Sequence, residues 1–161
     1  MNRLILLVTI CAAIVLTACG GYSSMSGSSN QTPAVTGTWN IAFAPSGVQG
    51  STPPPTTGLT VSFNQNGNSL TGTVTAVSNP PSSCFPAIAA SGTVFNVTGQ
   101  VSSGTGSNLN VSVAFTSGST NGTIMGNGSL AYLGTMANGT FSFSTSVAGC
   151  GSGTFTMTKI G

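Results

Sequence analysis

Apolar residues alternate with Thr, Ser and Asn at every second position through much of this sequence. Successive side chains of a β-strand point to opposite faces, so such an alternation gives a strand one apolar face and one polar face. The clearest stretch has Leu109, Val111, Val113 and Phe115 on one face, and Asn110, Ser112, Ala114 and Thr116 on the other. Beyond the N-terminal apolar run, no segment shows the 3.6-residue period of an amphipathic helix. The sequence therefore predicts an all-β, antiparallel fold.

The alternation recurs in eight short segments, separated by turns rich in Gly, Pro and Asn. The apolar residues that mark these segments run over Trp39–Phe43, Leu59–Phe63, Leu70–Ala76, Phe95–Val101, Leu109–Phe115, Ile124–Leu133, Phe141–Phe143 and Phe155–Met157. Between the second and third segments stands Asn66-Gly67, a strong signal for a two-residue hairpin turn. We therefore expect about eight strands that pair in chain order.

Charged residues are almost absent, which excludes whole classes of function. The 161 residues include two Lys or Arg and no Asp, Glu or His. Carboxylate or imidazole acid–base catalysis, a Ser-His-Asp triad and a His or carboxylate metal site are therefore excluded. Nucleic-acid binding is excluded as well, because no basic patch exists to neutralise phosphates. The one catalytic assembly left is a Ser or Thr beside Lys159, and nothing in the sequence activates that amine. We expect a protein that is not an enzyme, with no cofactor and no metal.

The first residues have the pattern of an export signal. Asn2 and Arg3 precede the apolar run Leu4–Val15, which is shorter than the roughly 20 residues of a membrane-spanning helix. The next four residues, Leu16-Thr17-Ala18-Cys19, resemble the lipobox of bacterial lipoproteins. In that family the leader is cleaved before the cysteine, and the cysteine carries the lipid. The alternative is an ordinary secretory signal with a chance cysteine.

The resemblance to lipoproteins implies a division of the chain. Residues 1–18 would be the signal peptide, residues 19–35 a lipidated Cys19 with a flexible Gly/Ser-rich tether, and residues 36–161 the folded domain. The protein would sit in the bacterial cell envelope, with the membrane as its partner through the lipid on Cys19. Because Gly20 and not Asp follows that cysteine, the outer membrane is favoured where the source has one.

The division of the chain also changes the count of cysteines. Cys11 would leave with the leader and Cys19 would carry lipid, so Cys84 and Cys150 remain. Two remaining cysteines in an exported chain are expected to form a disulfide. Two free thiols are the alternative, although no basic residue nearby in the sequence would activate either one.

The scarcity of charge predicts how the sheet ends. Open sheets guard their edge strands with Lys, Pro or inward-pointing charges, and the mature chain would keep Lys159 alone as a charged side chain. Closure into a barrel removes the edges, so we predict an up-and-down barrel. A membrane-spanning barrel is disfavoured, since the alternating segments are shorter than the roughly 9–11 residues it needs and lack aromatic girdles.

The start of the first strand, Gly37-Thr38-Trp39, resembles the G-x-W start of the lipocalin and avidin barrels, the calycin-like architecture. In lipocalins a basic residue near the last strand packs across this Trp, and Lys159 is the matching residue here; a solvated lysine is the alternative. The ligand residues of avidin-type proteins do not match, because the chain has one Trp and no Asp, and Asn40 comes one position early. The resemblance therefore implies the barrel and its signature Gly37, Trp39 and Lys159, and not biotin binding.

Chain order in such a barrel also constrains the disulfide. The loops between strands 1–2, 3–4, 5–6 and 7–8 share one rim, so a Cys84–Cys150 bridge would draw the 3–4 loop across one mouth. The mouth would then be plugged, or a small apolar pocket would lie beneath the loop. We therefore expect a membrane-anchored lipoprotein whose non-catalytic barrel binds a small apolar ligand or an envelope component. The alternative is a structural or adhesive Thr-rich surface domain with a filled barrel and no ligand.

Overall fold

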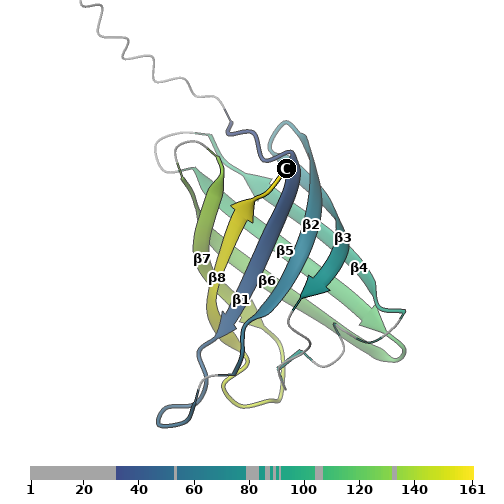
Figure 1. Ribbon diagram of the computed structural model, residues 1–161, viewed down its shortest axis with the longest axis vertical. Helices are drawn as coiled ribbons and strands as arrows, with labels where there is room; N and C mark the ends of the chain where they lie inside the picture. Colours follow the sequence, from purple (N-terminus) through teal and green to yellow (C-terminus); the bar gives the residue numbers. More distant parts are fainter. Residues whose placement is uncertain are drawn as a thin grey trace, which may run out of the picture.

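Eight antiparallel strands close into a barrel in a computed structural model, which describes residues 32–52, 54–78, 84–85, 88, 90, 92–103, 107–131 and 134–161 (Figure 1). The strands are β1 (Gly37–Pro45), β2 (Thr57–Asn66), β3 (Ser69–Ser78), β4 (Val94–Val101), β5 (Asn108–Ser117), β6 (Thr120–Leu130), β7 (Met136–Phe143) and β8 (Ser152–Lys159). Each strand pairs with the next one in the chain, and β8 pairs with β1. The predicted all-β, up-and-down barrel is confirmed, and its form is consistent with a calycin-like architecture.

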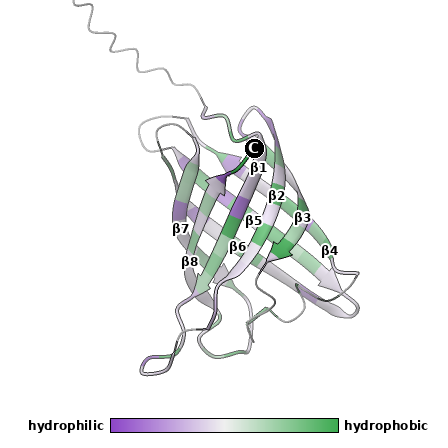
Figure 2. Cartoon of the chain, viewed as in Figure 1, coloured by the Kyte–Doolittle hydropathy of each residue, from purple (hydrophilic) through white to green (hydrophobic). Residues whose placement is uncertain are grey.

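The alternation in the sequence becomes an inner and an outer wall. In β1, Trp39, Ile41 and Phe43 point inward and are buried, while Asn40 between them is exposed. In Figure 2 most of the barrel is pale, with separate green and purple patches along the strands, as expected where few residues are charged. The described residues contain no helix long and apolar enough to cross a membrane.

The strand lengths expected from the sequence need correction. The strands run for 8 to 11 residues, longer than the alternating segments suggested, so length is no argument against a membrane-spanning barrel. The polarity of the walls is the relevant observation: the interior is apolar and the outer wall carries Thr, Ser and Asn, opposite to a barrel that faces lipid.

β6 ends at Leu130, and Leu133, the predicted end of the sixth segment, lies outside the described residues. A turn begins at Ala131, whose backbone N–H donates to the carbonyl of Met136 at 2.8 Å. Gly134, with φ of +62°, donates in turn to the carbonyl of Ala131 at 2.8 Å. The chain reverses there so that β7 can pair with β6.

Phenylalanine rings in the interior face glycines on the neighbouring strands. Phe63 pairs directly with Gly72, Phe115 with Gly122, and Phe141 with both Gly126 and Gly153. A Cβ built on Gly122 would stand 2.9 Å from two ring carbons of Phe115, and one on Gly153 would stand 2.6 Å from a ring carbon of Phe141. Gly72, Gly122 and Gly153 are thus positions over which rings lie, as in the aromatic–glycine pairs known from curved sheets.

The seam between β3 and β4 is the shortest in the barrel. The two strands pair only over Ser69–Gly72 and Val97–Gln100, whereas β2 and β3 pair along most of their length. Beyond Gly72, β3 continues to Ser78 and leads into the 3–4 loop, which carries Cys84. This end of the barrel is therefore where that loop enters.

Candidate functional site

The G-x-W start of β1 forms the corner where the two ends of the chain meet. Thr38 donates its backbone N–H to the carbonyl of Gly161 at 2.7 Å, and Ile160 donates to the carbonyl of Thr38 at 2.8 Å. Gly37 has φ of +127°, and a Cβ built there would stand 2.8 Å from Cε of Lys159 and also clash with the carbonyl of Gly161. Only glycine fits this position, which gives the first residue of the G-x-W motif a physical reason.

Trp39 closes this end of the barrel from within. Its side chain is fully buried, and its indole Nε1 donates to the carbonyl of Val35 at 2.7 Å. Val35, which we had assigned to the tether, is itself buried in the core. Its backbone N–H donates to Oε1 of Gln65 at 2.6 Å, and Nε2 of Gln65 donates to the carbonyl of Pro33 at 3.1 Å. The segment before β1 is therefore fixed across the mouth.

Lys159 lies beside this corner on the last residue of β8, where it is the register partner of Trp39. Its side chain is half-buried, and its aliphatic part lies against Gly37. Among the described residues it is the single charged side chain. A cation–π contact of its ammonium with the indole stays a prediction.

At the opposite end of the barrel lie the described residues of the 3–4 loop, among them Cys84, Phe85 and Ile88. Cys84 and Cys150 form the predicted disulfide, with Cα atoms 5.2 Å apart, and it joins the 3–4 and 7–8 loops. Phe85, next to the bridge, is fully buried, and Ile88 is also buried. The ring of Phe85 packs with its centroid 5.1 Å from that of Phe143 and 6.1 Å from that of Phe141. Of the two outcomes expected for this mouth, the burial of Phe85 and Ile88 favours the plug.

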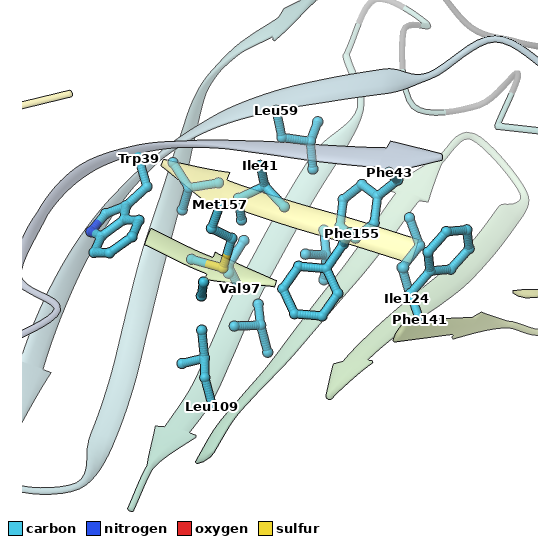
Figure 3. Close-up of a cluster of buried hydrophobic side chains, with 14 of the residues drawn as sticks. Trp39, Ile41, Phe43, Leu59, Val97, Leu109, Ile124, Phe141, Phe155 and Met157 are labelled. Atoms are coloured by element: carbon cyan, nitrogen blue, oxygen red, sulfur yellow. The ribbon is translucent and has the colours of Figure 1, made fainter. Parts of the chain in front are cut away.

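Side chains fill the space between the two ends. Figure 3 shows Trp39 at one end of the cluster, Met157 and Ile41 next to it, and the rings of Phe43, Phe155 and Phe141 at the other end. The rings of Phe43 and Phe141 meet edge to face, with centroids 5.4 Å apart. The core side chains are apolar with one exception, the fully buried Thr57, whose hydroxyl has no hydrogen-bond partner.

Two shallow hollows lie on the outer wall. The larger, about 280 Å³, lies over β4, β5 and β6, where Gln100, Asn110, Met125 and Asn127 line it. The smaller, about 210 Å³, adjoins it and shares Gln100 and Asn110. Sequence analysis missed both hollows, because alternation marks these positions only as outward-facing.

Sequence analysis also missed the roles of Phe85 and Gln65. Phe85 could have been singled out as the lone aromatic residue of the 3–4 loop, directly after a cysteine expected to be bridged. Gln65 carries no such signal, because it stands among other polar turn residues. Cys19 and the whole predicted signal peptide lie outside the described residues.

Comparison with protein-family models, curated proteins and solved structures gives no significant match for this chain. The class of protein is therefore defined by geometry alone: a closed eight-stranded antiparallel barrel with a disulfide between Cys84 and Cys150.

Proposed function

We propose that this protein is a membrane-anchored bacterial lipoprotein whose barrel is a structural or adhesive surface domain, without catalysis and without a ligand inside. Its lipid is attached at Cys19, within the lipobox-like Leu16-Thr17-Ala18-Cys19. The outer membrane is the favoured location. The domain acts on envelope partners through its outer wall.

The observation that carries the proposal is the filled interior. Trp39 and Val35 occupy one mouth, Phe85 and Ile88 occupy the other, and the apolar side chains between them are buried. A barrel of eight strands can be filled by side chains or can hold one small ligand, so the buried side chains and not the strand number support the first alternative. An apolar ligand would have to displace one of these plugs, each of which is held by buried contacts or by the disulfide. This favours a surface role over the ligand-binding role that the barrel pattern first suggested.

The way the chain enters the barrel supports a tether. The described segment begins at Thr32, and residues 33–35 cross the mouth that Trp39 closes. If Cys19 is lipidated, residues 19–31 connect the lipid to this end of the barrel, and a flexible Gly/Ser-rich segment of that length spans on the order of 20 Å. The disulfide end and most of the outer wall would then face away from the lipid.

Metabolic labelling of the full chain in a bacterial host with radioactive palmitate tests the anchor. The wild-type chain is expected to be labelled and to sediment with membranes, and Cys19→Ser to lose both properties. Cys11→Ser is the matched control, because this cysteine lies in the leader and its loss should leave labelling unchanged. An unlabelled wild-type chain, or labelling that survives Cys19→Ser, would contradict the proposal.

Native mass spectrometry of the purified chain tests whether the barrel is free of a bound ligand. The expected mass is that of the lipidated polypeptide two hydrogens below its reduced form, because Cys84 and Cys150 are bridged. A co-purified apolar small molecule, lost on unfolding, would return the assignment to a ligand-binding barrel.

A further inference from the structure

The outer hollow over β4, β5 and β6 has a regular construction. Two cross-strand rows of side chains border it, and each row has one residue from β4, one from β5 and one from β6. One row is Thr98, Ser112 and Met125, and the other is Gln100, Asn110 and Asn127. Neighbouring strands lie about 4.8 Å apart, so each row is about 10 Å long. The second hollow extends the amide row past Gln100 toward Asn68, at the β2–β3 turn.

The floor of the hollow is the row that lies between these two. Gly99, Val111 and Gly126 form it, and by the alternation of a strand they face the interior of the barrel. A Cβ on Gly126 would stand 3.1 Å from a ring carbon of Phe155, which places that position against the core. No side chain of the middle row rises from the outer wall, so the hollow lies between the two outward-facing rows.

The amides around the hollow are open to solvent. Gln100, Asn110 and Asn127 are exposed, and within the described part of the chain their side chains have no hydrogen-bond partner. Each amide offers two N–H donors and a carbonyl acceptor. Met125, 54% exposed, places an apolar thioether side chain beside them.

The two adjoining hollows form one groove along the outer wall of β4, β5 and β6. From this arrangement we infer that this groove binds a neutral carbohydrate chain. Sugar hydroxyls both donate and accept, which matches amides that offer both functions in one row, and the apolar face of a pyranose ring fits against Met125. No charged side chain lines the groove, and Lys159 stands on β8, which pairs with β7 and β1. A charged ligand would therefore find no counter-charge in the groove.

A peptide fits this groove less well than a sugar. An added peptide strand needs a free strand edge, and β5 is paired with β4 on one side and with β6 on the other along its length. The inference rests on the proposed function, because it names what the outer wall of the anchored domain would bind.

The test is a titration of the ¹⁵N-labelled full chain, kept in a detergent without a sugar headgroup, with neutral oligosaccharides. Maltoheptaose, cellohexaose and chitohexaose are the probes, each raised to about 10 mM, since a shallow exposed groove binds weakly. The side-chain NH₂ signals of Gln100, Asn110 and Asn127 are expected to shift together with at least one probe. Those of Asn64, which is exposed on β2, are expected to stay in place.

Variants separate the groove from the rest of the surface. Asn110→Ala removes one of the two amides that both hollows share, and it is expected to weaken binding about tenfold, the effect of one lost hydrogen-bonding group. Asn64→Ala is the matched control and should leave binding unchanged. Met125→Ala should weaken binding several-fold, whereas Met125→Leu should retain it, because the ring face needs an apolar contact and not sulfur.

Several outcomes would overturn the inference. They are no shift with any of the three probes, equal shifts at Asn64, unchanged affinity in Asn110→Ala, and tighter binding of a sulfated dextran than of the neutral probes. Shifts of the same amides with protein concentration alone would assign the groove to a second copy of the chain. None of these results alters the palmitate labelling of Cys19, so failure here is distinguishable from failure of the proposed anchor.

Discussion

Replacing Phe85 by alanine removes the plug of one mouth and tests whether the filled interior stabilises the fold. The ring is fully buried, and its centroid lies 6.4 Å from that of Phe43, 6.1 Å from that of Phe141 and 5.1 Å from that of Phe143. Truncating a buried Phe to Ala costs about 3–5 kcal/mol, because apolar contacts are lost and a cavity remains. For a domain of this size that loss lowers Tm by on the order of 15 °C.

The assay is thermal and urea unfolding followed by the fluorescence of Trp39, the one tryptophan of the chain. A dry apolar cavity binds benzene, so benzene should raise the Tm of Phe85→Ala and leave that of the wild type unchanged. Val48→Ala, at the exposed start of the 1–2 loop, is the matched control and should change stability by less than about 0.5 kcal/mol.

The reasoning is refuted if Phe85→Ala loses less than about 1 kcal/mol, because a fully buried ring cannot be removed so cheaply. It is also refuted if benzene stabilises the wild type as much as the variant, since a cavity would then exist already. Should Phe85→Ala fail to fold, Phe85→Leu keeps most of the volume and is expected to lose about 1–2 kcal/mol.

Three further results are expected from unfolding in urea. The Cys84→Ala, Cys150→Ala double variant should lose about 4 kcal/mol, the entropy of closing a loop across a sequence separation of 66; an unchanged midpoint would contradict this. Thr57→Val should gain about 1 kcal/mol, because it removes a buried hydroxyl without a partner, and a loss of stability would show that the hydroxyl is satisfied in solution. The free energy of unfolding should be the same at about pH 4.5 and pH 8, since Asp, Glu and His, whose ordinary titration would make stability change over this range, are absent; a shift above about 1 kcal/mol would count against it.

Much of the architecture follows from local pattern. The alternation of Leu109 to Phe115 predicted β5 and its inward face, and Asn66-Gly67 predicted the hairpin between β2 and β3. The near absence of charge predicted closure, because nothing else protects the edges of such a sheet. The pairing of Cys84 with Cys150 was predicted because Cys11 was assigned to the leader and Cys19 to the lipid, and two remaining cysteines of an exported chain are expected to pair. The structure confirms this disulfide.

The details of the candidate sites did not follow from local pattern. Gly122 and Gly153 precede the segments predicted as strands, and only the register shows that Phe115 and Phe141 lie over them. Phe85 stands in a loop, where an aromatic residue carries no period that would indicate burial.

The sequence by itself determined which face of each strand is apolar, the absence of carboxylate and imidazole side chains, and the candidate lipid site at Cys19. These are properties of residue type and of spacing over a few positions, which need no distant partner. Tertiary structure alone decided that Trp39 and Phe85 are buried at opposite ends of the barrel, that Val35 belongs to the core, and that Gln100, Asn110 and Asn127 form one row. The physical reason is register: which residues meet across a closed sheet depends on the pairing of all eight strands at once, and local sequence does not encode it.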